Sequence, residues 1–251
     1  MATYKKKGSK SKNKGFDSST KESTTAEVFE TLDVSASRTE RIVAKYQNYI
    51  IGFVAIAIIT VLGYLGYENL ILQPKSEEAN NELFTAQNYF NQALNNDQNS
   101  DSLFLLSLNG AEGKYGFLDI IENYRGTEAA NLSLYSAGMA YYNLNDFEKS
   151  INYLQDFNSE DEILNALAIG VIGDSFAELN QLDDALDSYT DAANSSPNKF
   201  SAPKFLLKAG NVAALLERKS LAVKFYKKIK SDYPNSIEAS LIDIQIGKNS
   251  L

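Results

Sequence analysis

The sequence of 251 residues contains no cysteine and no histidine. Without them the protein has no histidine general base, no Ser–His triad, no thiol nucleophile and no zinc ligated by His or Cys. Disulfides and thiol-linked lipids are excluded as well. The redox compartment stays open, because a chain that buries enough apolar surface folds without bridges. We therefore predict that the protein is not an enzyme.

Motifs for metals, phosphates and nucleotides are also lacking, since there is no EF-hand spacing, phosphate-binding loop or dinucleotide fingerprint. Two short acidic runs, at residues 159–162 and 183–184, are candidates for a carboxylate pair or a calcium site. We interpret both as helix starts, because acidic residues in a first turn satisfy free backbone N–H groups and the helix dipole. We expect no catalytic or metal-binding residue, no cofactor, no small-molecule substrate and no nucleic-acid partner.

Charge is absent from one long stretch, between Lys45 and Glu68. The 22 residues from Tyr46 to Tyr67 make a helix of about 33 Å, enough to cross a hydrocarbon core of about 30 Å. Tyrosines near both ends suit the two membrane–water interfaces. We predict a transmembrane helix within residues 46–73, with Pro74 at or just after its end, because proline cannot continue the hydrogen-bond ladder.

Two other interpretations of the apolar stretch are a buried helix of a large soluble domain and a cleaved secretory signal. The polar flanks offer no evident sheet or bundle to enclose a buried helix. A signal has about 7–15 apolar residues and a small-x-small cleavage site, whereas this stretch is longer, follows 45 residues of polar leader and ends in Gly-Tyr-Leu-Gly-Tyr. A retained signal-anchor is the better interpretation.

The leader, residues 1–45, differs in charge from the rest of the chain. It carries ten Lys/Arg against six acids, a net charge of +4, while the remainder has 14 basic and 26 acidic residues, a net charge of −12. Positive flanks stay in the cytoplasm. We expect a bacterial inner-membrane protein with its N-terminus in the cytoplasm and its acidic part in the periplasm, although a eukaryotic source leaves other topologies open.

The leader is predicted to be mostly disordered, because its first 25 residues are rich in Lys, Ser, Gly and Thr. Its lysines suit anionic lipid better than nucleic acid, or they serve only as a topology signal in a solvated tail. Residues 25–45 have the apolar spacing of a short cytoplasmic or interfacial helix.

Helical patterns without strand alternation fill residues 74–251, and three glycines show that these patterns repeat. Gly138, Gly173 and Gly210 are 35 and 37 residues apart. Similar side chains recur at fixed distances from each glycine, four residues before it and three, twelve, sixteen and nineteen after it. These residues are Leu134, Ile169 and Leu206; Tyr141, Phe176 and Ala213; Ser150, Ala185 and Ala222; Leu154, Tyr189 and Tyr226; and Phe157, Ala192 and Ile229.

The recurring residues predict pairs of antiparallel helices. The glycine and the small residue mark the place where the two helices of a pair cross closely. Pro197 and Pro234 end the second helices, and Glu162 stands at the same place in the first copy. Turns are predicted at 143–146, 180–183 and 217–220. Each pair buries its apolar face by stacking on its neighbour.

At these residues the chain resembles the tetratricopeptide repeat (TPR) family over residues 131–234. DFEKSINYL, DDALDSY and SLAVKFY look like its second helix, although the first helices lack Trp and Ser150 replaces the usual Ala. The resemblance implies an all-α solenoid with about three clear repeats. We expect a degenerate repeat upstream, with helices at 79–94 and 113–126 around an insertion and Gly113 in the small position, and a capping helix at 236–251.

TPR proteins use the inner face of the solenoid to bind extended peptides or partner helices. The predicted inner-face residues are Tyr135, Met139, Tyr142, Gly170, Asp174, Ala177, Leu207, Asn211 and Ala214. Tyr, Met and Leu indicate an apolar, adaptable groove, unless Tyr135 and Tyr142 pack against the preceding repeat. The Lys and Asn that clamp chaperone carboxylate tails in this family are missing from the first two clear repeats.

The order of basic leader, single span and TPR domain resembles the bacterial envelope TPR family that includes the ancillary SecYEG translocon subunit (YfgM-like). The resemblance implies a periplasmic scaffold that relays exported chains between translocon subunits and periplasmic chaperones. Two alternatives remain open. One is a coordinator of envelope assembly or of another secretion machine, and the other is an N-anchored import receptor whose TPR domain faces the cytosol of a eukaryotic cell.

Overall fold

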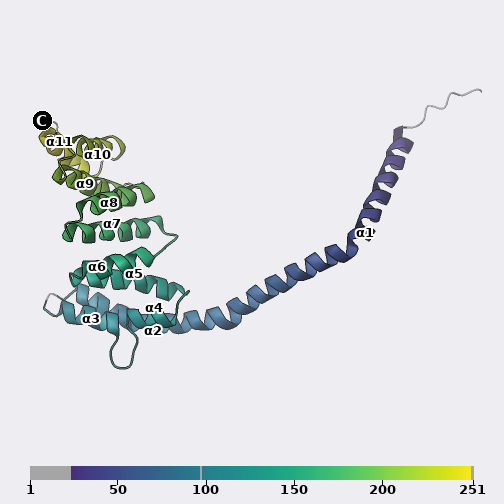
Figure 1. Ribbon diagram of the computed structural model, residues 1–251, viewed down its shortest axis with the longest axis horizontal. Coiled ribbons are helices and arrows are strands. Elements are labelled where there is room, and N and C mark those ends of the chain that lie inside the picture. The colour runs from purple at the N-terminus through teal and green to yellow at the C-terminus, as the bar shows by residue number, and fades with distance from the viewer. Residues whose placement is uncertain (1–23, 97, 250–251) are drawn as a thin grey trace, which may run out of the picture. The chain divides into compact units, whose positions relative to one another are not determined.

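The computed structural model describes the backbone of residues 24–96 and 98–249, and the side chains from residue 44 onward. The described part is all-α, as predicted, and contains no strand. The disorder predicted for the leader falls mainly on residues 1–23, which lie outside the described residues. The elements are α1 (Thr24–Tyr67), η1 (Glu68–Leu72), α2 (Gln73–Leu94), α3 (Ser100–Asn109), α4 (Phe117–Asn123), α5 (Glu128–Asn143), α6 (Phe147–Asp156), α7 (Glu162–Glu178), α8 (Leu182–Ser195), α9 (Ala202–Leu215), α10 (Lys219–Asp232) and α11 (Ile237–Asn249) (Figure 1).

Helix α1 contains both the predicted leader helix and the apolar stretch in a single element of 44 residues. By length and composition the apolar part is able to cross a membrane, and 0% of its most apolar window is buried. Phe53 and Ile59 are 74% and 69% exposed. The described protein therefore does not enclose this helix, contrary to what a buried core helix requires. The chain divides into two compact units between Tyr64 and Leu65.

The sequence predicts Pro74 at or just after the end of the membrane helix; α1 ends at Tyr67, and the helical path then continues past Pro74. The π-helical segment η1 follows α1 directly, and the backbone N–H of Gln73 bonds to the carbonyl of Glu68, five residues earlier. Pro74 then lies in the first turn of α2. A proline is tolerated there because the N–H that it lacks would have no intrahelical partner at a new helix start. The wide π-turn thus lets the path continue to Leu94.

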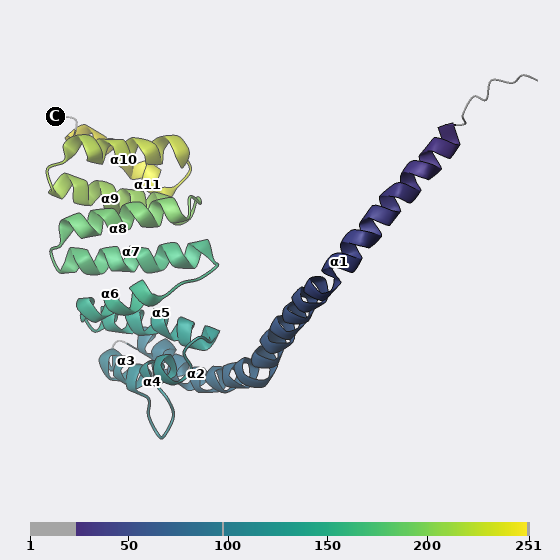
Figure 2. The same cartoon turned by 45° about the vertical axis from the view of Figure 1, so that its right-hand side comes forward.

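Three helix hairpins follow one another in the repeat region: α5 with α6, α7 with α8, and α9 with α10 (Figure 2). Their turns lie where the sequence predicts them. Each turn contains one residue with left-handed backbone, Asn145, Asn180 or Glu217, with φ between 56° and 60°. Asparagine tolerates this conformation well, because its short polar side chain bonds locally.

The glycines of the three hairpins lie at the predicted helix crossings. A Cβ atom on Gly138, Gly173 or Gly210 would lie within 2.8 Å of a side chain of the second helix of the same hairpin. Those side chains are Leu154, Tyr189 and Tyr226, respectively. The small residues Ser150, Ala185 and Ala222 are all 0% exposed. The two backbones approach closely at these crossings, so a glycine is needed on the first helix and a small residue on the second, as the repeat pattern predicts.

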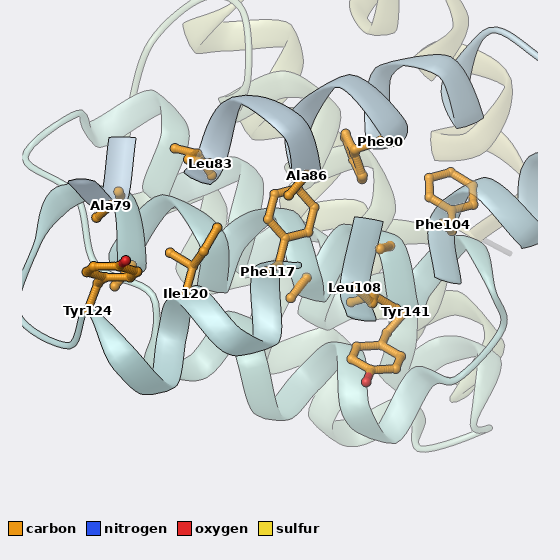
Figure 3. Close-up of a cluster of buried hydrophobic side chains, with 14 of the residues drawn as sticks. Ala79, Leu83, Ala86, Phe90, Phe104, Leu108, Phe117, Ile120, Tyr124 and Tyr141 are labelled. Carbon is orange, nitrogen blue, oxygen red and sulfur yellow. The ribbon is translucent and has the colours of Figure 1, made fainter. Parts of the chain in front are cut away.

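The degenerate repeat is built differently from the prediction. The partner of α2 is α3, which comes from the expected insertion, whereas α4 packs against α5. Gly113 lies in an exposed turn with φ 75° and not at a helix crossing. Helix α3 takes the place beside α2 because its apolar side chains need to be covered; it buries Phe104 and Leu108. Figure 3 shows the shared core, in which the Phe90 ring lies 5.6 Å from that of Phe104.

Both acidic runs lie at helix starts, as interpreted from the sequence. Asp161 caps α7, because its carboxylate accepts the backbone N–H groups of Ile163 and Leu164. Asp183 and Asp184 lie in the first turn of α8. These carboxylates therefore stabilise helix N-termini.

The predicted capping helix is present as α11, which packs against α10. Its Ile242 is 0% exposed. Residues 250 and 251, which the prediction included, lie outside the described residues.

A matched pair of alanine substitutions tests the helix crossings. Gly210→Ala adds a methyl group against the Tyr226 ring, so we expect it to lower the free energy of unfolding by about 1–3 kcal/mol. Gly247→Ala makes the same change in α11, where no described atom lies within 4 Å. It should leave stability unchanged or slightly higher. Thermal unfolding of the detergent-solubilised protein measures both, and equal effects would contradict the crossing.

Candidate partner-binding face

The nine residues predicted for the inner face lie on α5, α7 and α9, the first helices of the three hairpins. These helices are neighbours through the stack, because α5 also contacts α7, α9 also contacts α11, and Phe205 of α9 lies against Gly170 of α7. The first helices therefore form a continuous row. The surroundings of the nine side chains differ along this row.

On α5 the predicted residues are half-buried. The Tyr135 ring lies 5.2 Å from the ring of Phe157, at the end of α6. The Tyr142 ring lies 5.7 Å from that of Phe147, at the start of α6. Both tyrosines thus pack on their own hairpin, and Tyr135 also joins an apolar cluster that includes Ile172 of α7. Met139 packs in the other direction, on the core of α2–α5.

Gly170 of α7 is buried where α7 meets α9, because a Cβ atom there would overlap the ring of Phe205. Gly170 therefore makes room for a neighbouring helix and offers no side chain to a partner. Three other predicted positions, Ala177, Leu207 and Ala214, are partly buried against the core of α7–α11. Their exposed edges add apolar surface to the row.

Asp174 is the polar centre of the row. Its carboxylate accepts a hydrogen bond from the Tyr189 hydroxyl of α8 at 2.5 Å. It also forms an ion pair with Lys208 of α9. The ammonium of Lys208 lies 5.3 Å from the centre of the Tyr189 ring, which adds a cation–π contact. One carboxylate thus joins two adjacent hairpins.

Tyr189 and Lys208 were not among the predicted inner-face residues, although the sequence contained a signal for each. Tyr189 is the aromatic residue that faces Gly173, next to Asp174, and Lys208 directly follows the predicted Leu207. The third hairpin repeats part of this arrangement, because the Tyr226 hydroxyl donates to Asn211 at 3.0 Å. In the first hairpin Met139 stands at the place of Asp174 and Leu154 at the place of Tyr189. These contacts therefore change from apolar in the first hairpin to polar in the second and third.

The tyrosines of this face remain protonated at neutral pH. Burial raises the pKa of Tyr189, and its hydrogen bond to Asp174 raises that pKa further. Burial also raises the pKa of Tyr142, with a smaller contribution from the nearby Asp174 and Glu178 carboxylates. These hydroxyls therefore act as hydrogen-bond donors. Among the described side chains no cluster of carboxylates is arranged to hold a metal ion.

A cleft of about 440 Å³ lies between α2, α5, the α6–α7 connection and α7. Its lining includes Leu83, Asn131, Phe157 and Leu164. Asn131 fixes the connection, because its side-chain amide donates to the carbonyl of Asn158 at 2.5 Å. Since Phe157 also contacts Tyr135, the cleft adjoins the apolar part of the row.

Two family models described as tetratricopeptide repeat match the chain, one over residues 133–161 and the other over residues 205–236. Two segments of this chain thus match the tetratricopeptide repeat. The matches fall on hairpins α5–α6 and α9–α10, and they support a module that binds proteins. The hairpin between them, α7–α8, has the same glycine crossing. The search of curated proteins found no match.

Removing one hydroxyl tests the polar centre. We expect Tyr189→Phe to lower the free energy of unfolding by about 1–2 kcal/mol, because Asp174 loses a buried donor. Tyr153→Phe is the matched control, since the Tyr153 ring stacks on Tyr141 and its hydroxyl bonds to no described residue. Denaturant unfolding compares the two variants. Equal losses would contradict a specific role for the Tyr189 hydroxyl.

The raised pKa of Tyr189 predicts a dependence on alkaline pH. The unfolded chain releases this proton near the ordinary tyrosine pKa of 10.0, whereas the folded protein retains it. The resulting stability is complete below that pH and is lost as the pH rises above it. We expect the unfolding free energy of the wild type to fall more steeply between about pH 9.5 and 11.5 than that of Tyr189→Phe. Parallel curves would contradict this assignment.

Proposed function

We propose that this protein is a membrane-anchored TPR scaffold that binds protein partners on the periplasmic side of the bacterial inner membrane. The observation that carries the proposal is the pairing of a fully exposed apolar helix with a helical-repeat region. An exposed apolar surface of this length is costly in water and stable in a bilayer. A repeat region attached to it carries its binding surface at the membrane.

The chemistry of the row of first helices supports binding over catalysis. Its buried hydroxyls are committed to structural hydrogen bonds, as between Tyr226 and Asn211. Its half-buried aromatic residues, Tyr135 and Tyr142, offer edges that extended chains and helices pack against. At its centre Asp174 and Lys208 present both signs of charge. Such a surface suits polypeptides that combine apolar anchors with main-chain hydrogen bonds.

The charge distribution and the order of leader, span and repeat region support a role in protein export. The +4 leader and the −12 remainder favour a cytoplasmic N-terminus. In that orientation the repeat region meets chains as they leave the Sec translocon. We infer that its partners are translocon subunits, periplasmic chaperones or the exported chains themselves, in line with the resemblance to envelope TPR proteins.

Site-specific photo-crosslinking in living cells tests this function. A photoreactive amino acid replaces Tyr135, Met139 or Leu207 on the row, or Asn152 on the exposed side of α6 as the control. We expect crosslinks to translocon or chaperone subunits from the row and none from position 152. Equal labelling at all positions, or crosslinks only to proteins outside export and folding, would contradict the proposal.

A further inference from the structure

A fourth glycine continues the series that marks the helix crossings. Gly247 follows Gly210 by 37 residues, the same interval that separates Gly210 from Gly173. It lies on α11, which packs on α10 as α9 packs on α8. Ile242 of α11 is 0% exposed and corresponds to Phe205 of α9, which is 2% exposed. Helix α11 therefore has the position and the inward face of a first helix.

The outward face of α11 differs from those of the other first helices because no described element covers it. Gly138, Gly173 and Gly210 each face a side chain of a second helix, but no described atom lies within 4 Å of a Cβ placed on Gly247. Ile237 and Ile244 are 81% and 65% exposed. With Ser240 they form a line at intervals of three and four residues that ends at Gly247, which is the pattern of a helix-packing surface.

The last part of the repeat region is more basic than the part before it. Residues 68–198 carry four basic and 22 acidic residues, whereas residues 199–248 carry ten basic and four acidic residues. The sign of the charge therefore reverses along the solenoid. An acidic partner is attracted to one end of the repeat region and repelled by the other.

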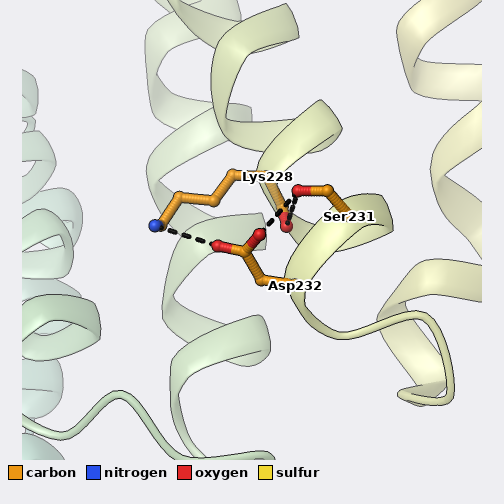
Figure 4. A network of polar contacts seen from close by, with 3 residues as sticks. All are labelled: Lys228, Ser231 and Asp232. Carbon is orange, nitrogen blue, oxygen red and sulfur yellow. Dashed lines mark hydrogen bonds and ion pairs between the residues drawn. The ribbon is translucent and has the colours of Figure 1, made fainter.

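Some lysines near α11 are committed to neighbours and others are not. Figure 4 shows Lys228, whose ammonium lies 3.1 Å from the Asp232 carboxylate. The Ser231 hydroxyl donates to the same carboxylate, and these contacts lower the pKa of Asp232. Lys230 pairs with Asp243 of α11, which places this side of α10 beside α11. Lys227, one turn before Lys230, forms no ion pair with a described residue.

We propose that the outward face of α11 is a second protein-binding surface that takes an amphipathic helix with acidic flanks from another protein. The incoming helix lies against α11 as a second helix lies against a first helix. One of its large side chains enters the space beside Gly247, while its apolar stripe covers Ile237 and Ile244. Its carboxylates meet Lys227 and Lys248. This face of α11 contains none of the nine candidate residues on α5, α7 and α9, so the proposal stands independently of the proposed function.

Charge and composition favour this occupant over a second copy or a bilayer. Two α11 helices packed face to face in parallel would bring the two Lys248 side chains together, which opposes that pairing. A helix that lies on an anionic membrane is rich in Lys or Arg and carries large aromatic residues. Helix α11 has one lysine, two acids, Glu238 and Asp243, and no aromatic residue.

Peptides taken from this chain serve as probes for the full-length protein in detergent. The α8 sequence, residues 182–195, is an acidic amphipathic second helix with four aspartates. The α10 sequence, residues 219–232, occupies the same place in its hairpin but is rich in lysine. By fluorescence anisotropy we expect saturable binding of the labelled α8 peptide, weakening with salt, and at least about tenfold weaker binding of the α10 peptide.

Substitutions in α11 test whether the α8 peptide binds to this helix. Ile244→Asp and Gly247→Ile should each weaken binding of the α8 peptide about tenfold or more. Both residues are exposed in the described structure, so the melting temperature should not change. Leu215→Asp is the matched control, because Leu215 is 71% exposed on α9. It should leave binding unchanged.

Four results would overturn the proposal. These are no saturable binding of the α8 peptide, equal binding of the α10 peptide, equal weakening by Leu215→Asp, and binding unaffected by both α11 substitutions. Self-association that Ile244→Asp abolishes, measured by analytical ultracentrifugation, would assign the face to a second copy. Binding to vesicles of anionic phospholipid that the same substitution abolishes would assign it to a bilayer.

Discussion

The close crossing of two helices at a glycine is the constraint on which the repeat region depends. At Gly173 and Gly210 the ring of a tyrosine from the second helix occupies the space that a side chain on the glycine would fill. The glycine of the first helix thus makes room for the tyrosine of the second helix. Overlap in such a site costs about 1–3 kcal/mol, against a typical domain stability of about 5–15 kcal/mol.

The same contact also shapes the candidate binding face. Because the rings of Tyr189 and Tyr226 lie over the glycines, their hydroxyls reach the next residue along, Asp174 or Asn211. Asp174 then binds Lys208 of the following hairpin. Packing inside one hairpin therefore determines which polar groups face a partner. In the first hairpin Leu154 has no hydroxyl, so the equivalent contact beside Met139 is apolar.

The sequence was most informative where contacts are local. Gly138 and Leu154 are 16 residues apart within one hairpin, so their spacing repeats and is visible in the chain. Contacts between hairpins were not predicted, because they depend on how neighbouring helices align in space. The ion pair of Asp174 with Lys208 and the burial of Gly170 are of this kind. Pairing of α2 with α3 depended on competition between two apolar segments, which periodicity alone does not resolve.

The central claim is that the row of first helices binds protein on one side of a membrane. Because the chain has no cysteine, Met139→Cys on the row and Asn152→Cys on α6 provide unique labels. The direct measurement is the rate of reaction of each with a membrane-impermeant maleimide, in spheroplasts and in the purified protein. The account predicts that both react in spheroplasts, with position 139 slowed relative to its rate in the purified protein and position 152 unchanged. No reaction until the membrane is opened, or unchanged rates at both positions, would contradict it.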